Sequence, residues 1–134
     1  MRESLPPSTS TSEVAELQLR KFQKELSAGT VSLALLAVLG AATDPMYGYQ
    51  IAKRLEQVGQ GVLAGKQSAL YPVLRNLSAS GLAESHVEPS VAGPLRRYYT
   101  ITPFGRRVLA AEMLRLRALV RLAEESRLIS PARA

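Results

Sequence analysis

The chain has 134 residues, a formal net charge of +6 and a sequence pI of about 10.1. This length predicts one domain with a short appendage. The chain has no cysteine and a single histidine, His86, so disulfides, thiol catalysis, Cys-ligated zinc and a His-pair metal site within one chain are excluded. Hydrophobic residues make up 46% and aromatic residues 5%. Leu, Val and Ala must therefore form the core, and Leu and Ala favour helix.

The basic charge is concentrated in the middle of the chain. Residues 1–44 carry four basic and five acidic residues (−1), residues 45–107 eight and three (+5), and residues 108–134 five and three (+2). Such a distribution indicates an anionic partner, nucleic acid above all. The alternative is a solvated basic surface without a dedicated partner.

Nothing in the sequence predicts a membrane segment. A spanning helix needs roughly 18 apolar residues, and the longest such run, Val31–Ala42, is shorter. The polar segment 1–12 lacks the apolar centre of a signal peptide. We expect a cytoplasmic protein.

The first half of the chain predicts three helices. One is expected over residues 10–28, ended by Gly29. Thr30 is expected to cap a second, Val31–Ala42, which is apolar almost all round and therefore predicted to lie in the core. The third is expected over Gly48–Val58.

The second half predicts a helix, a hairpin and a long final helix. Leu and Val repeat at helical spacing within Gln67–Ser80. Leu82–Glu88 and Arg96–Ile101 are predicted strands joined by a turn-rich connection. The pair Thr102-Pro103 is typical of a helix start, and that helix is expected to run to about Glu125.

This order predicts a mainly α winged helix-turn-helix: three helices and a β-hairpin wing, with an extra N-terminal helix and a C-terminal dimerisation helix. The predicted divisions are a tail (1–9), the N-terminal helix (10–28), the winged-helix DNA-binding domain (30–101), the dimerisation helix (102–126) and a second tail (127–134).

The helix before the hairpin stands in the recognition position. Its exposed face is predicted to carry Tyr71 and Arg75, with Gln67 and Ser68 near its start. Arg and Gln can form paired hydrogen bonds to guanine and adenine, and hydroxyls more often contact phosphate. The plainer interpretation is an ordinary amphipathic surface helix.

The wing offers a second basic group. Strand alternation places Arg96 and Tyr98 on one side and Arg97 and Tyr99 on the other, and we expect Tyr99 to pack on the core. Arg96, Arg97 and Tyr98 are therefore candidate DNA contacts in a minor groove or on phosphates. The alternative is an exposed hairpin with a solubilising arginine pair.

The last helix carries an apolar stripe that predicts a homodimer seam. Docking on the same domain is the alternative. The stripe repeats at 4-3-4-3 spacing and comprises Leu109, Met113, Leu116, Val120 and Ala123.

A pocket for a small hydrophobic or aromatic effector is a further hypothesis, placed across the dimer between the N-terminal and C-terminal helices. Its expected lining residues are Phe22, Leu26, Leu109, Met113 and Leu116.

Two other functional classes differ in how well the sequence supports them. A winged helix that binds proteins and not DNA remains open, since fold does not settle function. An enzyme is not expected, because no GxSxG, paired-carboxylate or phosphate-loop pattern is present, and no cofactor is predicted. His86 is interpreted as a surface or edge residue.

Several short motifs, in order and at compatible spacing, resemble the PadR family of bacterial transcriptional regulators. They are Tyr47-Gly48-Tyr49, Leu70-Tyr71-Pro72, Arg96-Arg97-Tyr98-Tyr99 and Thr102-Pro103-Phe104-Gly105, within about Leu26–Met113. The resemblance adds Tyr47 to the DNA-binding candidates. It implies a dimeric winged helix, repression of nearby genes and release from DNA by a small molecule.

This sequence departs from the family pattern in three places. Ala69 stands where the family often has Thr, and Lys66 where it often has a capping Ser or Asp. The chain also lacks the Trp that some relatives stack on flat ligands.

Overall fold

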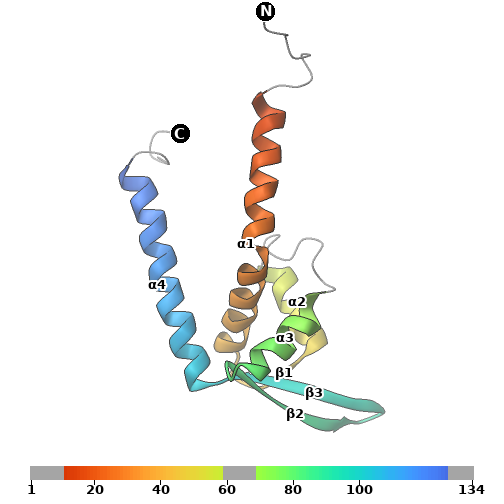
Figure 1. The fold of residues 1–134 in the computed structure, drawn as a ribbon. Helices are drawn as coiled ribbons and strands as arrows, with labels where there is room; N and C mark the ends of the chain where they lie inside the picture. Colours follow the sequence, from red (N-terminus) through yellow and green to blue (C-terminus); the bar gives the residue numbers. More distant parts are fainter. Residues whose placement is uncertain (1–10, 59–68, 127–134) are drawn as a thin grey trace, which may run out of the picture.

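A computed structural model describes residues 11–58 and 69–126 (Figure 1). The chain is mainly helical, with one small antiparallel sheet. The elements are α1 (Thr11–Ala41), β1 (Met46–Tyr47), α2 (Gly48–Val58), α3 (Leu70–Ala79), β2 (Ala83–Ser90), β3 (Gly93–Ile101) and α4 (Pro103–Glu125). This is the winged-helix fold class that the sequence predicts.

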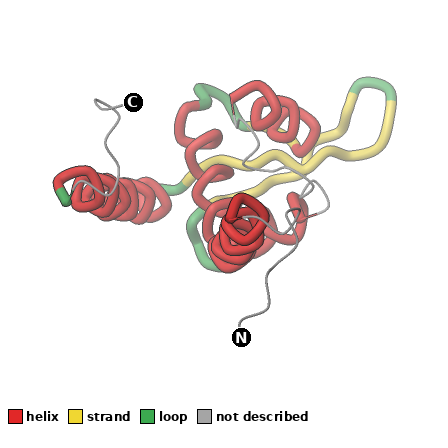
Figure 2. Tube along the Cα trace, turned by 90° about the horizontal axis from the view of Figure 1, so that it is seen from above, coloured by secondary structure: helices red, strands yellow, loops and turns green. Residues whose placement is uncertain are grey.

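The core lies where the second half of α1, α2, α3 and the root of the sheet meet. The sheet has the order β1-β3-β2, and the β2–β3 hairpin projects beyond the helices as the wing (Figure 2). Apolar residues at helical spacing on α1, α2 and α3 point into this core, as the sequence predicts. The side chains with almost no solvent exposure are Leu35, Leu36, Ile51 and Leu74.

The predicted break at Gly29 is wrong, because α1 is one helix of 31 residues. Thr30 does not cap a new helix: its hydroxyl donates a hydrogen bond of 2.9 Å to the Leu26 carbonyl, one turn back. Such hydroxyl bonds, together with a glycine, bend helices without ending them. The two halves, Thr11–Ser27 and Gly29–Ala41, are inclined by 57°.

The hairpin is longer than predicted. The expected loop Pro89–Leu95 is largely strand, since Ser90 pairs with Gly93 and only Val91 and Ala92 form the turn. Pro89 has no N–H for the ladder, and the register shifts between Glu88 and Ser90 to accommodate it.

Strand β1 was not predicted, because two residues are too few to show an alternating pattern. Met46 pairs with Tyr99, and Tyr47 with Tyr98. The pairing places the start of α2 beside the wing.

Thr102 joins the body to α4. Its hydroxyl accepts a hydrogen bond of 2.9 Å from the Gly105 amide and donates one of 2.7 Å to the Gly81 carbonyl. Gly81, with φ +79°, ends α3 in the left-handed conformation that glycine adopts without strain. The predicted cap at Thr102 and stop at Gly81 are confirmed.

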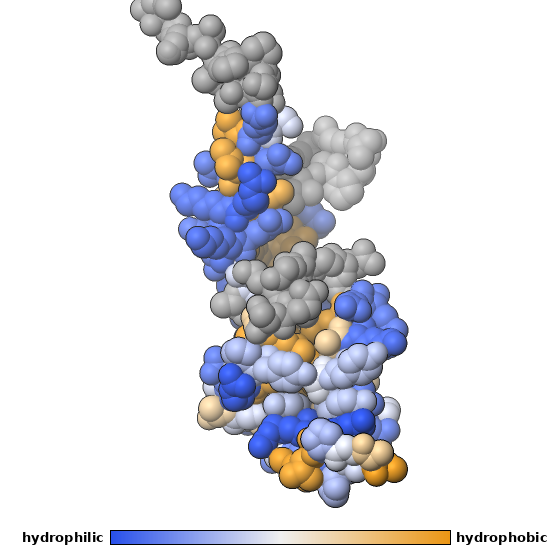
Figure 3. All heavy atoms as spheres, turned by 90° about the vertical axis from the view of Figure 1, so that its right-hand side faces the viewer, coloured by the Kyte–Doolittle hydropathy of each residue, from blue (hydrophilic) through white to orange (hydrophobic). Residues whose placement is uncertain are grey.

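The first half of α1 and most of α4 extend away from the body (Figure 1). We call these two segments, Thr11–Ser27 and Met113–Glu125, the arms. Large apolar side chains lie exposed on both, and Figure 3 shows them on α1 among hydrophilic residues. They are Val14, Leu17, Leu19, Phe22, Leu26, Leu114, Leu119, Val120 and Leu122.

Among the described residues, no single helix is both long and apolar enough to cross a membrane. The two halves of α1 meet the length and composition test only when taken together, and they are sharply bent against each other.

Candidate nucleic-acid interface

Helix α3 separates its side chains into a buried face and an open face. Leu70, Leu74 and Leu77 pack into the core, whereas Tyr71 and Arg75, one turn apart, are exposed. The two other predicted contacts on this helix, Gln67 and Ser68, lie outside the described residues. Pro72 fits because it lies in the first turn, where backbone amides have no partner within the helix.

The open face of α3 and one face of the wing converge on Tyr99. Its ring is buried as predicted, and burial raises the pKa of its hydroxyl. The nearby positive charges of Arg97 and Arg75 oppose that rise in pKa, whereas the nearby Tyr71 adds to it. Arg97 donates a hydrogen bond of 3.1 Å from Nη1 to Ser85 Oγ on the neighbouring strand. Two guanidinium groups and a phenol, from α3 and the wing, thus lie within electrostatic range of the Tyr99 hydroxyl.

The opposite face of the wing holds an aromatic cluster. The Arg96 guanidinium carbon lies 4.4 Å from the centre of the Tyr47 ring, a cation–π distance. Tyr98 meets Tyr47 edge-on at 5.5 Å, and His86 stacks on Tyr98 at 5.6 Å. The predicted contacts Arg96, Tyr98 and Tyr47 therefore lie together, but on the other face of the sheet from Arg97.

Among the residues that the structure describes, no acidic side chain forms an ion pair with Arg75 or Arg97. Within residues 11–58 and 69–126, ion pairs join His86 to Glu88 at 2.7 Å and Arg115 to Glu112. Neither pair includes Arg75 or Arg97, and both arginines are exposed. Their charges remain available to an anion, and phosphate is the anion that a planar guanidinium matches well.

Sequence reasoning missed two participants in these groups. Ser85 orients Arg97, and His86, interpreted as a plain surface residue, stacks in the aromatic cluster and pairs with Glu88. Both depend on the β2–β3 register, in which Ser85 pairs with Tyr99 and His86 with Tyr98. A predicted hairpin of uncertain loop length does not fix that register.

Comparison with known proteins places this fold and these motifs in a family. The model of the transcriptional regulator PadR-like family matches residues 35–111, more than half of the chain. The chain belongs to this family of transcriptional regulators. Members of this family are transcriptional regulators, which agrees with the expectation that the chain is not an enzyme.

Individual PadR-like proteins support the assignment. The chain is 34% identical over 107 residues to transcriptional regulator Rv3488 of Mycobacterium tuberculosis, covering 80% of this chain and 88% of the relative. A PadR family regulator from Eggerthella lenta shares the fold with a TM-score of 0.63 at 23% identity, covering 85% of this chain and 92% of that one.

One solved relative is bound to nucleic acid. Bacillus subtilis PadR, whose structure is of a complex with operator DNA, matches with a TM-score of 0.54 at 22% identity. The match covers 61% of this chain and 45% of that protein. At this identity the likeness concerns the fold alone.

In this PadR-like chain, the first residue of the predicted dimerisation stripe lies in the body and the other four lie on the arm formed by α4. Leu109 is half-buried and packs against the core, near Gly40 of α1. Further along α4, an open depression is lined by Met113, Leu116, Arg117, Val120, Arg121 and Glu124. Ala123 is half-buried on the same helix.

The residues of the predicted effector pocket are not gathered in one place within the chain. The depression on α4 includes Met113 and Leu116 but not Leu109, Phe22 or Leu26. Phe22 and Leu26 lie exposed on the first half of α1. A pocket of all five residues would need α1 of a second copy and stays a prediction.

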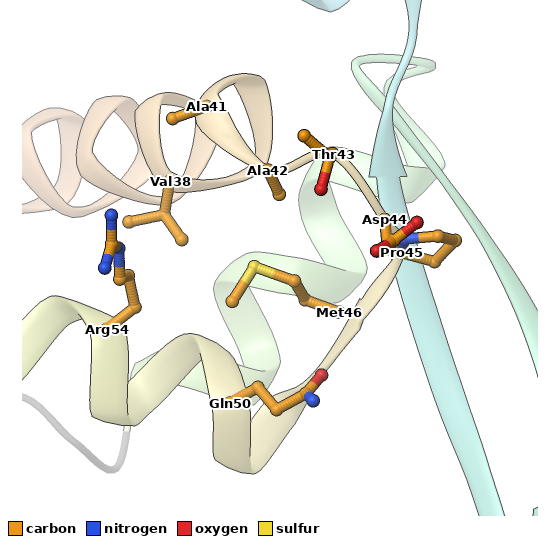
Figure 4. Close-up of a pocket in the computed structure, with 9 residues that line it drawn as sticks. All are labelled: Val38, Ala41, Ala42, Thr43, Asp44, Pro45, Met46, Gln50 and Arg54. Carbon is orange, nitrogen blue, oxygen red and sulfur yellow. The ribbon is translucent and has the colours of Figure 1, made fainter.

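A separate cleft lies where α1 ends and α2 runs beside it (Figure 4). Gln50 and Arg54 line it from α2, Val38 from α1, and Met46 from β1. The Gln50 amide oxygen accepts a hydrogen bond of 3.1 Å from the Tyr47 amide. Arg54 therefore belongs to this cleft and lies outside the α3–wing face, the exposed surface formed by Tyr71, Arg75 and Arg97.

Proposed function

We propose that this PadR-like regulator binds double-stranded DNA sequence-specifically, with α3 in the major groove and the wing beside it. The observation that carries the proposal is that Arg75, Arg97 and Tyr71 are all exposed near Tyr99, where α3 meets the wing, without a neutralising carboxylate among the described residues. A major groove accepts one α-helix, and side chains on its outward face reach bases and phosphates. The operator complex of Bacillus subtilis PadR supports this use of the fold.

We propose further that the active form is a homodimer joined through the arms. Nine large apolar side chains exposed on two helices exceed what an isolated small domain usually presents to water. A second copy that covers them would also supply a second recognition helix. The matching operator is an inverted repeat with half-sites about one helical turn, roughly 34 Å, apart.

The remaining elements of the proposal rest on family membership. We infer a cytoplasmic repressor that a small hydrophobic or aromatic effector releases from DNA. Phe22, Leu26, Leu109, Met113 and Leu116 are the proposed effector contacts, reached between α4 and α1 of the two copies.

The test is fluorescence anisotropy of the full chain on DNA from upstream of its own gene and on random DNA, over a series of salt concentrations. We expect tight, salt-dependent binding that random DNA does not displace. Arg75→Ala and Arg97→Ala should each weaken binding by about 1–3 kcal/mol. If the lost contact is to phosphate, the log–log salt slope should fall by about 0.9.

Arg54→Ala is the matched control, since it removes the same charge from the cleft of Figure 4. Equal losses in the Arg54 and Arg75 variants would mean that net charge, and not the α3–wing face, determines binding. Weak binding that is the same for all sequences, in the upstream DNA and in a selection from genomic fragments, would favour a protein-interaction role and overturn the proposal.

A further inference from the structure

Gly48, the first residue of α2, is buried beneath the ring of Tyr71. A Cβ atom placed on Gly48 would lie 2.5 Å from both Cε1 and the hydroxyl oxygen of Tyr71, and 2.8 Å from its Cζ. These separations are far below van der Waals contact. The absence of a side chain at position 48 is therefore what allows the Tyr71 ring to occupy its place.

Backbone conformation does not explain this glycine. Among the described glycines, only Gly81 has a positive φ. Gly48 begins a helix in a conformation that any residue adopts, and alanine is a better helix former than glycine. Position 48 requires glycine because the Tyr71 ring occupies the space where a Cβ atom would lie.

The contact affects the open part of the α3–wing face. Tyr71 is 51% exposed, so one side of its ring rests on Gly48 while the rest faces solvent. It lies one turn before Arg75, on the same face of α3. A side chain that is held in one orientation before binding loses less conformational freedom when it binds.

A second glycine shows what a purely structural contact looks like. A Cβ on Gly105 would lie 2.1 Å from the backbone oxygen of Leu82, which cannot move without the chain. At Gly48 the opposing atoms belong to the far end of a side chain that can rotate away. A methyl group at Gly48 therefore displaces Tyr71, whereas one at Gly105 disturbs the fold.

We propose that Gly48 is a positioning residue for DNA recognition, and that it holds the Tyr71 phenol in the orientation in which α3 presents it to DNA. The proposal rests on the DNA-binding function proposed above. Gly48 itself makes no contact with the nucleic acid in this account. It acts through Tyr71 alone, so its effect on binding should vanish when the Tyr71 ring is removed.

The experiment is a double-variant cycle on the full chain, with anisotropy on the upstream DNA fragment as readout. Gly48→Ala should weaken binding roughly three- to tenfold. In a Tyr71→Ala background the same substitution should change binding by less than about twofold, because the displaced ring is gone. Gly40→Ala is the control, since a Cβ there meets Ile101, Leu109 and Arg106 only at 3.7–3.9 Å.

A second measurement on the free protein separates this proposal from the proposed function. In wild type, nuclear Overhauser effects should join the Gly48 α-protons to the Tyr71 ring, and Gly48→Ala should abolish this proximity while circular dichroism stays unchanged. Absence of these effects in wild type would overturn the proposal. So would an equal loss of affinity on Gly48→Ala with and without Tyr71. A wild type that binds no DNA would refute the proposed function, while the Overhauser effects would still show whether Gly48 holds Tyr71.

Discussion

The body and the arms of this PadR-like chain use the same residue types to opposite effect. In the body, Leu, Ile and Val at helical spacing are covered by α1, α2, α3 and the sheet. In the arms, Leu and Val at similar spacing remain open to solvent. An apolar stripe therefore predicts burial without specifying which surface covers it. The body covers its stripes within the chain, whereas those of the arms stay exposed, and this exposure is the basis of the proposed dimer.

The largest effect should come from creating a cavity in the core of the body. Leu74 is fully buried, so Leu74→Ala should lower the free energy of unfolding by about 2–5 kcal/mol through lost burial and a cavity. Leu95, 67% exposed on the wing, is the control, and Leu95→Ala should change that free energy by less than about 0.5 kcal/mol. Urea denaturation measures both. Similar losses at the two positions would mean that the described core does not carry the stability of the fold.

A second prediction tests the arms. Replacing Leu116 and Val120 with Glu places two charges on the proposed seam and should raise the dimer dissociation constant by roughly 100-fold. Sedimentation velocity should show monomers, while circular dichroism shows an intact body. Leu95→Glu places a charge on an exposed apolar residue of the wing, outside the arms, and should leave the dimer unchanged. A dimer that persists in the double variant would move the interface away from α4.

The smallest effect should come from the aromatic cluster on the wing, because its side chains are exposed or only half-buried. Tyr47→Leu removes the ring on which Arg96 stacks and should cost about 0.5–1 kcal/mol of stability. The same substitution should cost little more when Arg96 is already Ala, and thermal unfolding of the four proteins provides that comparison. Additive effects would mean that the stacking of Arg96 on Tyr47 does not stabilise the contact between the wing and β1.

Local sequence chemistry predicted much of the body. Thr102-Pro103 strongly favours a helix start and Gly81 a helix end, and the structure confirms both. The break at Gly29 failed because a glycine followed by threonine fits a helix bend as well as a helix end. The local sequence does not distinguish the two, since packing of the following turns decides between them.

The candidate site was predictable in its parts but not in its grouping. Helical spacing placed Tyr71 and Arg75 on one face, and strand alternation separated Arg96 from Arg97. Residue spacing within one element does not show which other elements pack against it. The contacts of Arg96 with Tyr47 and of Tyr71 with Gly48 join segments whose relative position depends on β1, a strand of two residues.

Selection of bound sites from random DNA by the purified full chain directly tests DNA recognition by α3 and the wing. We expect enrichment of an inverted repeat whose half-sites are centred about 10 base pairs apart, and loss of that enrichment in the Arg75→Ala variant. Recovery of no preferred sequence, or of an identical repeat with the variant, would contradict recognition of DNA by the α3–wing face.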